Sequence, residues 1–152
     1  LASLKAEGDG DIPESLLEGI YHCATIEQTE KGEPLSPDKW RHRSEGNRVV
    51  IVFTDAPFKD PMEQPKGGTL DDVVNVCHSN RIILQVFAPE MDCYDELGCI
   101  DKADCHLFDY DKADPEGPIK ALNEFTSDKQ VFKETLQALA KTIAQDWRIW
   151  VF

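Results

Sequence analysis

Three segments of the chain are almost continuously apolar, and the segments between them carry apolar residues at helical spacing. The apolar segments are Arg48–Phe53, 81–88 and 105–110, and they are rich in β-branched and aromatic side chains. Apolar runs of this length are typical of strands that helices cover on both faces. We therefore predict that Arg48–Phe53 is a central strand and that the three segments are parallel neighbours in chain order.

Helices are predicted between these strands. Asp11 and Glu14 have the spacing of a capping box, ahead of a segment whose apolar residues recur at helical spacing. Thr69 would cap a second helix, a short helix is expected around residues 94–100, and a long amphipathic helix over residues 128–145. Strands that alternate with helices indicate βαβ units. The expected fold is α/β, with a doubly wound, mainly parallel sheet and helices on both faces.

The composition fits a single domain over residues 1–152, because 41% of the residues are hydrophobic and a chain of this size can bury one core. No apolar run approaches the ~20 residues that a spanning helix needs, so no membrane insertion is expected. The 29 acidic residues against 16 basic ones give a net charge of −13, which repels nucleic acid. The five cysteines, an odd number in a chain of this size, favour reduced thiols and a cytoplasmic location.

Asp55 follows the first apolar segment almost directly, after Thr54. In open parallel sheets, ligands gather outside the carboxyl ends of the strands. A carboxylate at such a position needs backbone amides, a basic side chain, a metal ion or solvent to stabilise its charge. Asp55 is therefore the first candidate for a functional residue, and a solvated carboxylate is the alternative.

Two motifs resemble the von Willebrand factor A family, especially the integrin β-subunit version and bacterial relatives. The first is Gly-Asp-Gly-Asp-Ile-Pro-Glu-Ser at residues 8–15, ahead of the first predicted helix. The second is Val-Ile-Val-Phe-Thr-Asp-Ala-Pro at residues 50–57. The later predicted elements follow in the family's order, so the resemblance covers nearly the whole chain.

The resemblance implies a metal-ion-dependent adhesion site. In such a site Mg²⁺, or Mn²⁺ or Ca²⁺, keeps a position open for an acidic side chain of a protein partner. By position, Asp55 would contact the cation, usually through water, and Glu14 would be a ligand from the second loop. Asp11 would cap the helix and serve an adjacent cation, although a capping box explains Asp11 and Glu14 without metal. The function expected from the resemblance is a protein-interaction module, not an enzyme.

The sequence departs from the family at its first loop, because the motif Asp-x-Ser-x-Ser is absent. We therefore expect the first strand to lie upstream of Leu1, so that residues 1–152 are the C-terminal two-thirds of the domain. The cation is then expected only when that loop is supplied. Without the first strand, the edge of Arg48–Phe53 needs another cover. The candidates are an upstream segment, a second copy of the chain, or residues 147–152.

Two alternatives to this interpretation differ in what Asp55 does. In the first, the chain is a structural module of the same fold with a degenerate, metal-free site. In the second, it is an α/β enzyme or receiver-like domain in which Asp55 is a catalytic or phosphate-accepting carboxylate. The second alternative needs a companion acid pair and a lysine after a later strand, whereas Pro89 and Glu90 follow residues 81–88.

Overall fold

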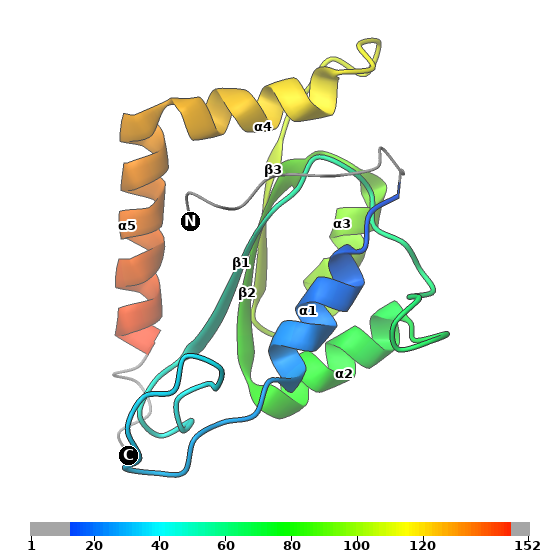
Figure 1. Cartoon of the computed structure of the whole chain (residues 1–152). Helices are drawn as coiled ribbons and strands as arrows, with labels where there is room; N and C mark the ends of the chain where they lie inside the picture. The colour runs from blue at the N-terminus through cyan, green and yellow to red at the C-terminus, as the bar shows by residue number, and fades with distance from the viewer. Residues whose placement is uncertain (1–12, 147–152) are drawn as a thin grey trace.

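The computed structural model describes residues 13–146 and shows an α/β fold around a parallel sheet (Figure 1). In the described chain the sheet has three strands in the order β1-β2-β3. They are β1 (Arg48–Phe53), β2 (Ile82–Pro89) and β3 (Ala103–Phe108). Both pairings are parallel, with Arg48 opposite Ile82 and Leu84 opposite Ala103. The predicted order and direction of the strands are therefore confirmed, although β3 begins two residues earlier than the predicted 105.

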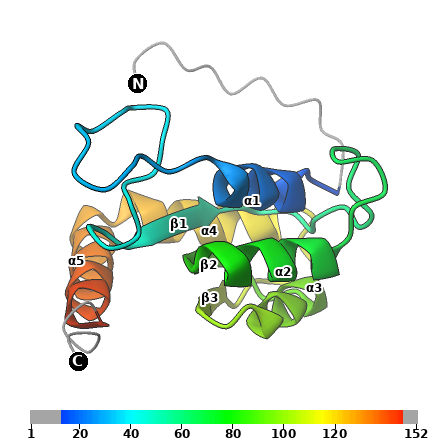
Figure 2. The same ribbon diagram turned by 90° about the horizontal axis from the view of Figure 1, so that it is seen from below.

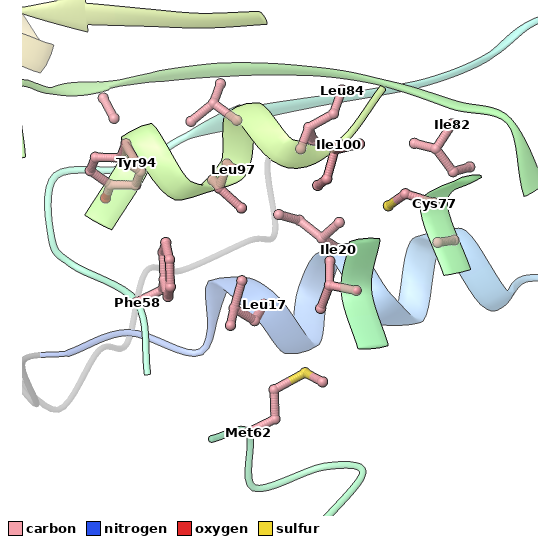
Figure 3. Packing of buried hydrophobic residues seen from close by; sticks show 14 residues of the cluster. Leu17, Ile20, Phe58, Met62, Cys77, Ile82, Leu84, Tyr94, Leu97 and Ile100 are labelled. Carbon is pink, nitrogen blue, oxygen red and sulfur yellow. The ribbon is translucent and has the colours of Figure 1, made fainter. Parts of the chain in front are cut away.

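One face of the sheet is covered by three helical segments, visible to one side of the strands in Figure 1. They are α1 (Leu16–Thr25), α2 (Leu70–Asn80), and α3 (Asp92–Glu96) with the short helix η1 (Leu97–Cys99). Figure 3 shows their apolar side chains meeting those of β2. These core residues are at most 2% exposed: Leu17, Ile20, Cys77, Ile82, Leu84, Tyr94, Leu97 and Ile100. Thr69 precedes α2 and its N–H donates to Asp72 Oδ2 at 2.9 Å, as the predicted cap requires.

The other face of the sheet packs against α4 (Gly117–Ser127) and lies beside α5 (Lys129–Asp146). Phe87 on β2 stacks on Phe125 of α4, with ring centroids 5.4 Å apart. Seen along the strands, α5 lies beside β1 and away from α2 and α3 (Figure 2). The sequence analysis predicted the long helix α5 but not α4.

The first correction concerns β1, which was predicted to be a central strand. In the described chain β1 pairs only with β2 and forms the edge of the sheet. Ile51 is 42% exposed and Phe53 40% exposed. Between β1 and α5 runs an open apolar groove of about 560 Å³, lined by Val49, Ile51, Leu136, Leu139, Ala140 and Ile143 together with Asn47. Residues 147–152, one of the three candidate covers for this edge, lie outside the described residues.

The second correction concerns the start of α1. The helix begins at Leu16 with Ser15 as its N-cap, so Glu14 precedes the helix and is not in its first turn. The backbone of Glu14 is bonded elsewhere: its N–H donates to Pro57 O at 2.7 Å, and its carbonyl accepts from Lys59 N–H at 2.8 Å. This bridge holds Glu14 out of the helix and excludes it from a capping box. Asp11 lies outside the described residues.

Candidate functional site

The loop that carries Asp55 continues directly from β1 at the carboxyl end of the sheet. Thr54 N–H donates to Phe87 O at 3.1 Å, which extends the pairing with β2 by one residue. Thr54 Oγ1 donates to Ala56 O at 3.3 Å and closes a tight turn around Asp55. Asp55 is half-buried in this turn. The end of a parallel strand and the local turn together place the Asp55 carboxylate at the edge where ligands of such sheets bind.

Glu14 lies on the segment that precedes α1, and it is held against the same loop. An isolated β-bridge pairs Glu14 with Phe58, which lies three residues after Asp55. The backbone of Glu14 is therefore held beside the loop that carries Asp55. The Glu14 residue itself is exposed. The fold therefore brings two residues that are far apart in the sequence to one edge of the sheet.

Tyr94, on α3, holds the loop that carries Asp55. Its hydroxyl is fully buried, donates to Ala56 O, and lies 3.5 Å from Thr54 Oγ1. Burial, with smaller contributions from the charges of Asp55 and Glu14, raises the pKa of Tyr94 to about 12. Both carboxylates thus act electrostatically on the same buried hydroxyl. Figure 3 shows the Tyr94 ring beside Phe58, and the two rings meet edge to face with centroids 6.1 Å apart.

The same edge of the sheet carries further acidic residues. Glu90 follows β2 and Asp109 follows β3, and both are exposed. Glu90 N–H donates to Phe108 O at 2.9 Å, so its backbone is part of the sheet while its side chain is left at the end of the strand. The carboxyl end of the sheet is therefore acidic at all three strands. Such an edge attracts cations and repels an acidic partner unless a cation lies between them.

The donor set for a metal ion is incomplete in the described chain. Within residues 13–146, no three His, Cys, Asp or Glu side chains form a group that could hold a metal ion. Glu14 and Asp55 alone offer two carboxylates, whereas Mg²⁺ and Ca²⁺ take six or more oxygen ligands. A cation held only by these residues would keep most of its water and bind weakly. The residues present therefore do not form a tight cation site by themselves.

Comparisons with known proteins assign no family to this arrangement. A scan against protein-family models finds no match, and searches of curated proteins and of solved structures return no significant similarity. The interpretation of the site consequently rests on the residues and their geometry.

The cysteines do not form a reactive centre. All five are free thiols. Burial raises the pKa of Cys77 to about 11 and also raises the pKa of Cys93 and of Cys105. Thiols with raised pKa values are poor nucleophiles and poor metal ligands near neutral pH, because only the thiolate reacts.

Two features of the site were not found by sequence reasoning. Tyr94 was placed in a short helix, but its bond to the carbonyl of Ala56 joins distant segments and leaves no local pattern. Glu18 had a recognisable signal, because Ser15 and Glu18 have the Ser-x-x-Glu spacing of a capping box. The Glu18 carboxylate accepts from Glu63 N–H at 2.6 Å and from Gln64 N–H at 3.0 Å, and these bonds, with one from Ser15, lower its pKa. Glu18 thereby anchors the loop after Asp55 to α1.

None of the helices within residues 13–146 combines the length and apolar composition that a membrane crossing requires.

Proposed function

We propose that this chain is a protein-interaction module of the von Willebrand factor A type, doubly wound, which binds its partner at the carboxyl edge of the sheet. The observation that carries the proposal is the meeting of Glu14 and Asp55 at that edge, from two loops that the resemblance assigns to one cation site. The order of the parallel strands is compatible with such a fold but is shared by other α/β proteins.

A divalent cation, Mg²⁺ or else Mn²⁺ or Ca²⁺, is part of this proposal. The acidic side chain of a partner would meet Asp55, Glu90 and Asp109 at this edge and be repelled. A cation bound there would offset part of this negative charge and would leave a position open for the partner's carboxylate. Tight binding needs oxygen ligands besides Glu14, Asp55 and water. A loop with Asp-x-Ser-x-Ser is the expected source, and Asp11 is the candidate for an adjacent cation.

The test is the thermal unfolding of the protein with and without Mn²⁺. A ligand that binds only the folded state stabilises it by about 2.7 kcal/mol at a hundred times its Kd. Mn²⁺ should therefore raise the melting temperature of the wild type. Asp55→Ala should abolish this increment while the metal-free protein stays folded.

A matched control is Asp38→Ala, which removes an exposed carboxylate from the loop between α1 and β1. This variant should keep the full response to Mn²⁺. Equal responses of the wild type and Asp55→Ala would contradict the adhesion site. A folded wild type with no response at all would instead favour the metal-free structural module.

A further inference from the structure

A partly open cavity lies at the edge of the sheet opposite Asp55, where the strands begin. This cavity of about 540 Å³ is bounded by the loop before β1, the end of α2, and the starts of β2 and β3. These segments meet at the lower edge of the sheet in Figure 1. A volume of this size is typical of sites for small molecules.

The lining of the cavity is cationic, although the whole chain has a net charge of −13. Four basic side chains line the cavity, Arg43, Arg48, Arg81 and Lys102, against the single carboxylate of Asp101. His78 also contributes to the wall, and its Nε2 accepts a hydrogen bond from Asp101 N–H at 3.1 Å. Cys77, Ile82 and Ile83 also border the cavity, but all three residues are buried, so the accessible part of the wall is mainly polar and charged.

The environment of Arg48 is the strongest indication that the cavity binds an anion. The Arg48 side chain is only 6% exposed, yet its guanidinium has neutral partners: the side-chain oxygen of Gln28, and Asn80 O and Oδ1 at 3.3 and 3.4 Å. Its buried Nε has no acceptor in the described chain. Burial and the charge of Arg43 both lower its pKa. A buried cation without an anionic partner is costly, and an anion bound in the cavity would compensate it.

Arg81 provides a second observation at the same wall. It follows α2 with φ 54° and ψ 46°, the left-handed conformation in which glycine is the usual residue. An arginine costs conformational energy there, and the conformation itself is explained by the end of α2, where Arg81 N–H donates to His78 O at 3.2 Å. Arg81 therefore counts toward the site as a further guanidinium that lines the cationic cavity.

We propose that this cavity is a binding site for a small organic phosphate monoester. A guanidinium can donate two parallel hydrogen bonds to two oxygens of a phosphate group. A phosphate monoester carries close to two negative charges at neutral pH. A dianion compensates the charges of the three arginines that line the cavity better than a monoanion does. This site is independent of the cation site at the opposite edge.

The experiment is a calorimetric titration of the protein with phenyl phosphate, compared with benzoate, which has a similar ring but one negative charge. Phenyl phosphate should bind saturably and at least about tenfold more tightly than benzoate, because charge-assisted bonds to arginine scale with the anion's charge. Arg43→Gln should weaken phenyl phosphate binding about tenfold, the equivalent of one such bond. Arg43 is exposed, so its loss should leave the fold intact.

The matched control is Arg41→Gln, which removes the same charge from the same loop at an exposed residue that does not line the cavity. This variant should bind phenyl phosphate within about twofold of the wild type, because distant surface charges are screened by salt. A third variant, Arg81→Gly, should melt at a higher temperature than the wild type and still bind more weakly. Weaker binding in a variant with a raised melting temperature cannot be due to unfolding.

Three results would overturn the proposal. The first is the absence of saturable binding of phenyl phosphate at millimolar concentration. The second is equal weakening by Arg41→Gln and Arg43→Gln, which would reduce the interaction to general electrostatic attraction. The third is benzoate binding as tight as that of phenyl phosphate, which would assign the cavity to carboxylates.

Discussion

At the residue scale, two buried polar side chains differ in whether their hydrogen-bonding groups have partners. Tyr94 and Arg48 are both almost fully buried, but they differ in how they are satisfied. The hydroxyl of Tyr94 has two partners, whereas Arg48 keeps an unpaired Nε. Neither environment was predictable from the sequence, because the partners Ala56, Gln28 and Asn80 come from distant segments and partly use backbone atoms. The sequence did predict the position of Asp55 just after a strand, because the apolar run alone marks the end of that strand.

The pKa of Tyr94 makes a prediction for stability at alkaline pH. Its folded pKa of about 12 lies above the ordinary value of 10.0, so its contribution is complete below pH 10 and is lost as the pH rises from 10 to 12. Urea unfolding at a series of pH values should show the free energy of unfolding falling through this window. Tyr94→Phe should flatten the fall and cost roughly 1 kcal/mol at neutral pH, the value of a typical hydrogen bond.

The half-buried Tyr21 on α1 provides the control for this measurement. Tyr21→Phe should retain the alkaline fall of the wild type. An unchanged pH profile in Tyr94→Phe would contradict the assignment of the fall to Tyr94.

At the scale of elements, the sequence predicted the strands well and one helix not at all. The order of β1, β2 and β3 followed from their uninterrupted apolar runs. The helix α4 was missed because Gly117 and Pro118 at its start are residue types typical of turns. Gly117 is needed for a steric reason. A Cβ at this position would lie 2.6 Å from Asp111 O, so only glycine fits the close approach of the two segments. Pro118 is compatible with the first turn of a helix, where no N–H is needed.

Asp128 separates α4 from α5 and caps the second of them. Its Oδ1 accepts from Gln130 N–H and from Val131 N–H, both at 3.0 Å. Asp128→Ala should cost about 1 kcal/mol, the usual value of an N-cap, and should fray the first turn of α5. Amide hydrogen exchange at Gln130 and Val131 measures this directly and should become faster.

Asparagine caps helices about as well as aspartate, so Asp128→Asn is the matched control. Exchange at the two amides should then stay close to that of the wild type. If alanine and asparagine accelerate exchange equally, the charge of Asp128 acts on the helix dipole and the cap is not responsible.

At the scale of the whole molecule, the uncovered side of β1 is the main departure from the sequence prediction. The apolar run indicated cover on both faces, but the described chain leaves Ile51 and Phe53 about two-fifths exposed. A hydrophobic residue indicates that its side chain can be buried, but it does not indicate which segment of the chain covers it. An edge strand with an apolar face is a template for pairing with another chain.

Replacing Ile51 by lysine should therefore reduce self-association of the 152-residue chain. A charge on an edge strand opposes strand pairing, and a substitution at an exposed position usually changes stability by less than about 0.5 kcal/mol. Light scattering as a function of concentration should show less association in Ile51→Lys than in the wild type.

Leu35→Lys is the control, since Leu35 is 66% exposed in the loop between α1 and β1 and adds the same charge away from the strand. It should associate as the wild type does. Equal effects of the two substitutions would show that net charge, and not the β1 edge, governs association.

The two ends of the sheet differ in sign, and this gives the molecule an electric polarity along its strands. Acidic residues gather where the strands end, and arginines where they begin, separated by about 20 Å for a six-residue strand. On a positively charged resin or sensor surface, the molecule would settle with its acidic end down. Immobilisation of that kind exposes the cationic cavity to solution and hides Asp55, so the chosen surface chemistry decides which of the two sites an experiment can reach.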